Sequence, residues 1–138
     1  MNPEGRVLAV DYGEKRIGIA LSDPMRMFAK PLCVLPNHGY EEMVNELMQL
    51  IETHEVKLLI FGIPYAIDGS NTPKTDECEA VFTKLKTDLD LPVQGYDERY
   101  STCEADTELK KLGYTWQEAR KVKDAMAACM FLKEYLNQ

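Results

Sequence analysis

Short apolar runs separated by turn residues fill the first quarter of the chain. β-Branched and other apolar residues dominate 6–11 (RVLAVD) and 17–21 (IGIAL), with Gly13 between the two runs. A third short apolar run follows at 33–35. Runs of this length, bounded by Gly and Pro, are typical of strands joined by turns. The pattern therefore predicts three consecutive strands.

From residue 40 onward, helical and strand patterns alternate. Apolar residues recur at helical spacing over 40–55, and 56–61 (VKLLIF) is a nearly continuous apolar run of the kind that is buried on both faces of a parallel sheet. A second helical pattern covers about 74–89, and a short strand is predicted over 92–96 (PVQGY).

Two capping motifs predict that the chain ends in two helices. Ser101 with Glu104 opens a helix that Gly113 closes, and Thr115 with Glu118 opens the last one. The predicted order is therefore βββαβαβαα, which indicates an α/β protein with helices packed on a sheet. A length of 138 residues corresponds to one domain, so we expect 1–138 to form a single unit.

The overall charge argues against one way of binding nucleic acid. The chain has 23 acidic and 16 basic residues, a net charge of −7. Proteins that hold polyanions by bulk charge are usually strongly basic. A metal-binding cluster of carboxylates would also raise the acid count, however, so a nucleic-acid enzyme stays open.

Other features favour a reduced, cytoplasmic protein. The first residues lack the charged and apolar regions of a secretory signal, and the longest apolar run, 58–63, is too short to cross a bilayer. The four cysteines show no paired spacing, so we expect free thiols, and the two histidines are too far apart in sequence to indicate zinc. We expect no membrane partner.

Acidic residues fall where α/β proteins place catalytic groups, at the ends of strands. Asp11 ends the first predicted strand, and Asp97-Glu98 follow the last one. Asp124 lies inside the final helix among alanines, which is costly for a carboxylate unless it faces a cleft. If these acids converge, they would bind Mg²⁺ or Mn²⁺, which prefer carboxylate oxygens.

Each acid also has an ordinary alternative. Asp11 could cap the turn at Gly13. Asp97 and Glu98 could pair with Arg99, and Asp124 could pair with a basic neighbour on its helix. Asp11 and Gly13, followed by Gly18, are also similar to the phosphate-binding hairpin of actin-like and sugar-kinase ATPases. That fold needs two lobes around ATP, and this chain has the length of one.

Four motifs occur in order along nearly the whole chain: VDYG (10–13) with RIGIA (16–20) and SD (22–23); FGIP (61–64) with DGS (68–70); DERYST (97–102); and KDAMAA (123–128). Together they resemble the YqgF/RuvX family, an RNase H-like group described as Holliday junction resolvases and, for bacterial members, as pre-16S rRNA nucleases. The resemblance implies an RNase H-like fold, a central mixed five-stranded sheet flanked by helices. Many RNase H-like enzymes have a further acid at the end of the central strand, where this chain has Gly62.

The resemblance also implies a site. Asp11, Asp124 and one of the adjacent acids would be the catalytic ligands of Mg²⁺ or Mn²⁺. We favour Glu98 over Asp97, because neighbouring strand residues face opposite ways and only one of the two points inward. The residues expected to contact the substrate are Lys15, Arg16, Gly69, Ser70, Arg99 and Lys123.

The leading functional hypothesis is a metal-dependent nuclease that cuts structured RNA and matures the 5′ end of pre-16S rRNA. One alternative is cleavage of four-way DNA junctions, which needs two paired cuts and so a symmetric dimer. The sequence leaves monomer and homodimer open. Another alternative is a binding module that keeps the RNase H-like scaffold without catalysis.

Overall fold

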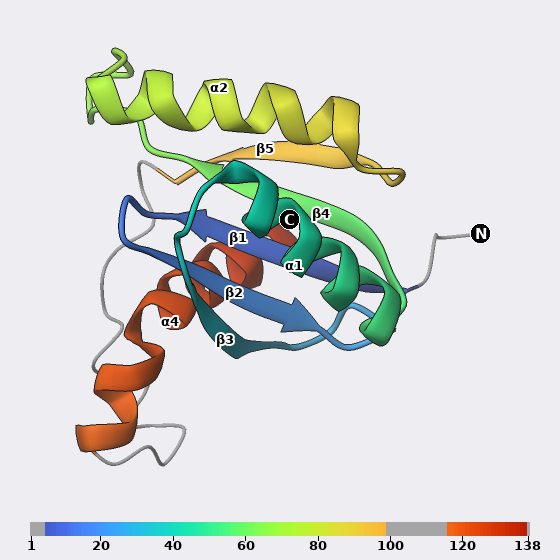
Figure 1. Cartoon of the computed structure of the whole chain (residues 1–138). Helices are drawn as coiled ribbons and strands as arrows, with labels where there is room; N and C mark the ends of the chain where they lie inside the picture. The colour runs from blue at the N-terminus through green and yellow to red at the C-terminus, as the bar shows by residue number, and fades with distance from the viewer. Residues whose placement is uncertain (1–4, 99–115, 138) are drawn as a thin grey trace.

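A mixed sheet of five strands, in the order β3-β2-β1-β4-β5, forms the centre of the molecule (Figure 1). The computed structural model describes residues 5–98 and 116–137, with side chains in the last helix described from Ala125 onward. The strands are β1 (Arg6–Tyr12), β2 (Arg16–Ser22), β3 (Ala29–Pro36), β4 (Val56–Ile63) and β5 (Val93–Asp97).

The direction of the strands decides which residues meet. β1, β2 and β3 form an antiparallel meander, whereas β4 pairs in parallel with both β1 and β5. The carboxyl ends of β1, β4 and β5 therefore lie at one edge of the sheet, where α/β proteins gather their sites. Asp11, Gly62 and Asp97 belong to these ends.

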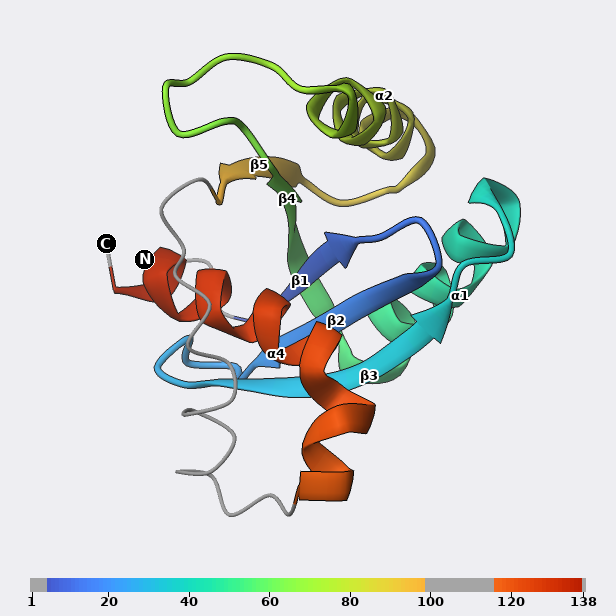
Figure 2. The same cartoon turned by 90° about the vertical axis from the view of Figure 1, so that its left-hand side faces the viewer.

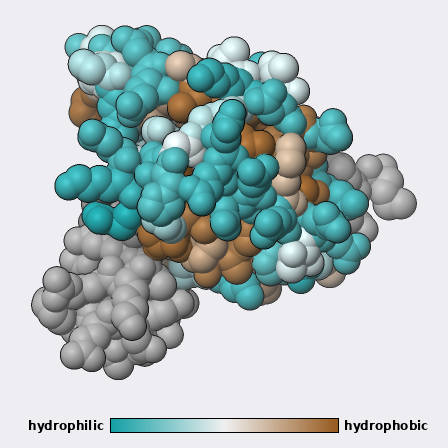
Figure 3. All heavy atoms as spheres, in the orientation of Figure 1, coloured by the Kyte–Doolittle hydropathy of each residue, from teal (hydrophilic) through white to brown (hydrophobic). Residues whose placement is uncertain are grey.

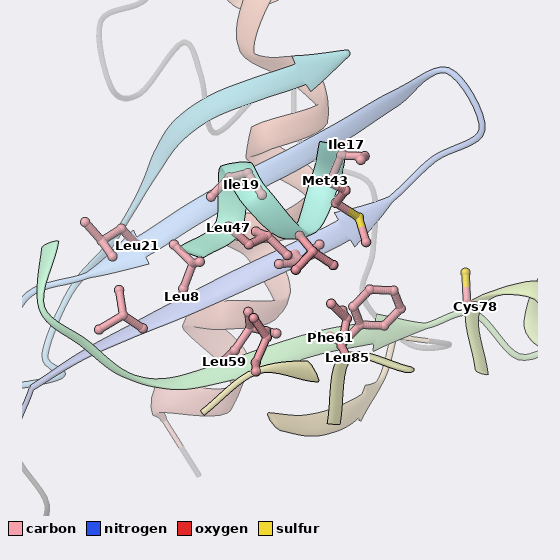
Figure 4. Close-up of a cluster of buried hydrophobic side chains, with 14 of the residues drawn as sticks. Leu8, Ile17, Ile19, Leu21, Met43, Leu47, Leu59, Phe61, Cys78 and Leu85 are labelled. Atoms are coloured by element: carbon pink, nitrogen blue, oxygen red, sulfur yellow. The ribbon is translucent and has the colours of Figure 1, made fainter. Parts of the chain in front are cut away.

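Helices cover both faces of the sheet. Helices α1 (Tyr40–His54) and α2 (Pro73–Asp88) lie on one face and α4 (Trp116–Leu136) on the other (Figure 2). The first face has the larger buried cluster, which includes Phe61, Leu47 and Leu85 (Figure 4). The second has a smaller cluster in which Phe131 and Met126 of α4 pack on the sheet. Hydrophilic side chains cover most of the outer surface of α1 and α2 (Figure 3).

Alternation along β1 sets the direction of its acid. Leu8 and Val10 belong to the cluster under α1 and α2, whereas Val7 and Ala9 belong to the cluster under α4. Side chains two residues apart share a face of a strand. Asp11 therefore lies on the α4 face, at the end of the row that Val7 and Ala9 begin.

The predicted fold is confirmed: the described elements follow the expected order, and their bounds agree within about two residues for all but one element. The predicted helix from Ser101 to Gly113 lies outside the described residues. The exception is the third strand, predicted over 33–35, which extends over Ala29–Pro36 because it pairs with β2 from end to end. Pro31 obscured it in the sequence, and an edge strand tolerates proline. Across the described residues, no helix is long and apolar enough to span a membrane.

Candidate active site

Two acids from distant parts of the sequence meet at the carboxyl ends of the parallel strands. Asp11 is the penultimate residue of β1 and pairs with Gly18 of β2. Glu98 follows β5 directly, and its backbone N–H donates a hydrogen bond of 3.3 Å to the carbonyl oxygen of Ile63 at the end of β4. This bond extends the β4–β5 pairing by one step and fixes where Glu98 leaves the sheet.

Gly62 makes room for the carboxyl group of Glu98. A Cβ placed on Gly62 would overlap Glu98 Oε2 and would lie 2.9 Å from Cε2 of Phe131. The carboxyl group therefore lies directly over the backbone of β4, beside the Phe131 ring of α4. Because both Phe131 and Asp11 are on the α4 face, Glu98 and Asp11 share that face. A residue with a side chain at position 62 would displace one of these neighbours.

The carboxyl group of Glu98 is in an environment that disfavours its negative charge. Its Oε2 is buried and has no hydrogen-bond partner. Burial, and after it the negative charge of Asp11, raise the pKa of Glu98 to about 8. Asp97 raises this pKa further, whereas the positive charge of Lys74 lowers it. A buried polar atom without a partner is rare in folded proteins and is often found at functional sites.

Asp97 lies on the other side of β5. Asp97 is exposed and lines a cavity of about 400 Å³ together with Ile63, Tyr65 and Phe82. Phe82 belongs to α2, so this cavity is on the α2 side of the sheet edge. The adjacent acids thus point in different directions, and Glu98 is the one that approaches Asp11.

The third expected ligand is only partly placed. The backbone of Asp124 belongs to α4, one turn before Ala128, which is buried against the sheet. Its side chain lies outside the described residues, as do the side chain of Lys123 and the whole of Arg99. Among the residues described, no group of three His, Cys, Asp or Glu residues is arranged to hold a metal ion.

The other expected substrate contacts lie at the same end of the sheet. Lys15 lies in the turn between β1 and β2, Arg16 is the first residue of β2, and both are exposed. Gly69 and Ser70 lie in the loop between β4 and α2, where the Ser70 hydroxyl donates a hydrogen bond of 2.6 Å to Asp68. Gly69 has a φ of 89°, which favours glycine. These residues border the carboxyl edge of the sheet.

Sequence reasoning missed the contribution of Gly62 and of Lys74. Glycine inside a buried strand often marks close approach by another group. Gly62, which follows the apolar run 56–61, is such a glycine. Which group approaches could not be read from the sequence, because Glu98 is 36 positions away. Lys74 gave no signal, since a lysine at the start of a helix is usually an ordinary surface residue.

The acid pair fits a hard divalent cation. Carboxylate oxygens are the ligands that Mg²⁺ and Mn²⁺ prefer. The charge of a cation would offset the repulsion between Asp11 and Glu98, and a ligand bond would satisfy the Oε2 atom that has no partner. Within the described part of the chain, the ligands of the metal would be the carboxylates of Asp11 and Glu98. Their chemistry agrees with the metal expected from the sequence.

Comparison with known proteins places the chain in a family. The family described as "RuvX: Holliday junction resolvase" matches residues 5–138. The chain belongs to the RuvX family. A RuvX relative from Dictyoglomus turgidum is 37% identical over 132 residues, covering 96% of this chain and 94% of the relative. Another, from Maridesulfovibrio salexigens, is 35% identical and covers 95% of this chain and 97% of the relative. Both are named "Putative pre-16S rRNA nuclease".

Solved structures confirm the RNase H-like fold of this RuvX chain. RuvC from T. thermophilus, determined with a Holliday junction substrate, superposes with a TM-score of 0.59 at 12% identity and covers 97% of both chains. The Fowlpox virus resolvase, also determined with Holliday junction DNA, gives a TM-score of 0.55 at 10% identity, covering 96% of this chain and 99% of the other. At these identities the likeness shows the fold alone.

Proposed function

We propose that this chain is a nuclease that depends on Mg²⁺ or Mn²⁺ and hydrolyses phosphodiester bonds in pre-16S rRNA, at its 5′ end, in the cytoplasm. The observation that carries the proposal is the pair of acids Asp11 and Glu98. The Oε2 atom of Glu98 is buried over Gly62 and has no hydrogen-bond partner. The pair occurs in an RNase H-like fold whose relatives are named as pre-16S rRNA nucleases.

The residues of the site have distinct tasks in this proposal. Asp11 and Glu98 would hold the cation, with Asp124 as the third ligand from α4. A divalent cation held there stabilises the negative charge that develops on the phosphate and activates a water molecule. The buried central strand β1 fixes Asp11 in position, and Glu98, which follows the edge strand β5, is held by its backbone hydrogen bond to Ile63 of β4. Lys15, Arg16, Gly69, Ser70, Arg99 and Lys123 would position the nucleic acid.

A four-way DNA junction is the second candidate substrate. It is favoured by the family description and by the two neighbours determined with Holliday junctions. Resolution of a junction needs two symmetric cuts and so two copies of the chain. A monomer suffices to mature one RNA end. The two candidate functions can therefore be distinguished by the oligomeric state and also by the substrate that is cut.

The test offers the wild-type protein both substrates with Mn²⁺: an RNA containing the 5′ precursor and mature start of 16S rRNA, and a four-way DNA junction. We expect Mn²⁺-dependent cleavage of the RNA, none in excess EDTA, and little cleavage of the junction. If a dimer makes paired cuts in the junction and leaves the RNA intact, the substrate is branched DNA and not RNA. Binding of RNA without cleavage at any Mn²⁺ concentration would favour a binding module and contradict the nuclease.

A further inference from the structure

A lysine at the start of α2 lies at the same edge of the sheet as the acid pair. Lys74 is the second residue of α2, whose first turn is fixed by a capping box between Thr72 and Thr75. The Thr75 hydroxyl also donates to the carbonyl oxygen of Pro64, two residues beyond Gly62. The first turn of α2 is thereby tied to the end of β4, over which the carboxyl group of Glu98 lies.

Helical spacing gives the direction of Lys74. It is four residues before Cys78, so both lie on the same face of α2. Cys78 is 1% exposed and packs in the cluster between α2 and the sheet, near Phe61 (Figure 4). Lys74 is itself exposed. It therefore continues the sheet-facing row of α2 past the end of the sheet, at the edge where Asp11 and Glu98 lie.

Electrostatics agree with this placement. Burial raises the pKa of both Glu98 and Cys78, the negative charge of Asp11 raises both further, and the positive charge of Lys74 opposes the rise in both. The charges of Lys74 and Asp11 thus act on the same two groups with opposite sign. Among the described basic residues, Lys74 is the one whose charge acts on Glu98.

Helix stability does not explain a lysine here. The N-terminal end of a helix carries a partial positive charge, so a cation in the first turn is unfavourable. The bulk charge of −7 also opposes the approach of nucleic acid. The ammonium group of Lys74 beside the acid pair would favour binding of a substrate phosphate at the place where the proposed reaction occurs.

We propose that Lys74 contacts the substrate, its ammonium group binding a phosphate oxygen at or next to the bond that is cut. The proposal rests on the proposed function and adds a substrate-binding residue from α2 to the residues expected from the motifs. A lysine acts on phosphate as a point charge. Each phosphate contact of this kind adds a fixed amount to the salt dependence of nucleic-acid binding.

The experiment measures binding of a fluorescein-labelled RNA hairpin with a single-stranded 5′ extension, across a KCl series. Ca²⁺, which also takes carboxylate ligands, replaces Mn²⁺, and a gel verifies that the RNA stays intact. For Lys74→Ala we expect the slope of log affinity against log salt to decrease in magnitude by about 0.7–0.9, the value for one lost phosphate contact. Lys74→Arg should restore the slope.

Lys84→Ala is the matched control. Lys84 is ten positions further along α2, about 15 Å away along the helix axis, and its ammonium lies 5.2 Å from the centre of the Tyr40 ring. This variant should keep the wild-type slope. Lys74→Ala should keep or raise the melting temperature, because it removes a cation from a helix N-terminus.

An unchanged salt slope in Lys74→Ala, or an equal loss in Lys84→Ala, would overturn the phosphate contact. Failure of the proposed function looks different: wild-type protein that binds the RNA but cuts neither RNA nor junction in Mn²⁺ would overturn the nuclease, while the salt slope would still report on Lys74. Wild-type protein that binds no RNA would overturn both.

Discussion

Asp11→Asn is expected to reduce Mn²⁺-dependent cleavage by about 10³-fold or more, which corresponds to about 4 kcal/mol of transition-state stabilisation. Asparagine has nearly the same shape but no charge. It would remove the negative ligand that β1 contributes to the proposed cation site and leave the sheet intact. The measurement is the single-turnover cleavage rate of wild type and variant on the same substrate.

Asp97→Asn is the matched control for this substitution. It makes the same chemical change at an acid adjacent to Glu98 in sequence but exposed, on the cavity of the α2 side. We expect Asp97→Asn to keep its cleavage rate within about threefold, since a surface charge has a small effect. If Asp97→Asn were inactive and Glu98→Gln active, Asp97 would be the ligand and the placement of Glu98 would be wrong.

Gly62→Ala is expected to reduce cleavage by about 10²-fold, although one methyl group is added and no acid is changed. The new Cβ would overlap Glu98 Oε2 and would lie close to the Phe131 ring. Phe131 is 1% exposed and packed in the core, so the carboxyl group is the neighbour that moves. Displacement of a ligand by about 1 Å is enough for a loss of this size.

The same substitution should lower stability only moderately. Overpacking usually costs about 1–3 kcal/mol, and moving a poorly solvated carboxyl group toward water offsets part of it. Thermal unfolding of the variant, followed by circular dichroism, should therefore show a cooperative transition at a somewhat lower temperature. A folded Gly62→Ala variant with wild-type activity would contradict the position assigned to Glu98.

Gly95→Ala gives the matched glycine control. Gly95 is on β5, and a Cβ there would lie 3.3 Å from Cζ of Phe82, on the α2 side of the sheet. A shift of the Phe82 ring by a few tenths of an ångström would accommodate it. Because Glu98 is not involved, we expect this variant to cleave at nearly the wild-type rate.

Most of the fold could be predicted from the sequence because local signals agreed with one another. The apolar run 56–61 is buried on both faces as β4, and the helical spacing over 40–55 became α1 with Met43 and Leu47 inward. The third strand was underestimated, because its pairing with β2 is a long-range interaction that no local pattern reveals. The order of the strands within the sheet likewise depends on packing, and the family resemblance implied only a mixed sheet of five strands.

The site could be predicted only in part. Strand-end position and the resemblance singled out Asp11 and the Asp97-Glu98 pair, and alternation favoured Glu98 over Asp97. The arrangement of Glu98 over Gly62 depends on which strands are neighbours, and that follows from the sheet and not from spacing along the chain. The direction of Lys74 depends in the same way on how Thr75 ties α2 to Pro64.

The acidity of the chain has a consequence for substrate binding. With a net charge of −7, attraction between the protein and nucleic acid at long range is weak. Affinity must therefore come from the cation, from a few lysines and arginines near the site, and from the shape of the substrate. We therefore expect weak binding of free RNA when no divalent cation is present.

If Asp11 and Glu98 together hold the divalent cation, a calorimetric titration with Mn²⁺ at several pH values should show it. A metal ligand must be deprotonated, and in the metal-free protein the pKa of Glu98 is about 8. Below that pH a proton has to leave before the cation binds. The apparent affinity of wild type should therefore rise about tenfold per unit between pH 6 and 8 and level off above it.

Glu98→Gln removes the group that titrates, so this variant should bind Mn²⁺ weakly, without that pH dependence. Asp11→Asn should also bind weakly. Asp97→Asn should bind Mn²⁺ as tightly as wild type and keep the pH dependence, which should level off at a slightly lower pH because the charge of Asp97 raises the pKa of Glu98. Joint binding by Asp11 and Glu98 requires this pattern across the four proteins. Mn²⁺ binding that is equally tight in wild type and Glu98→Gln, and independent of pH in both, would contradict it.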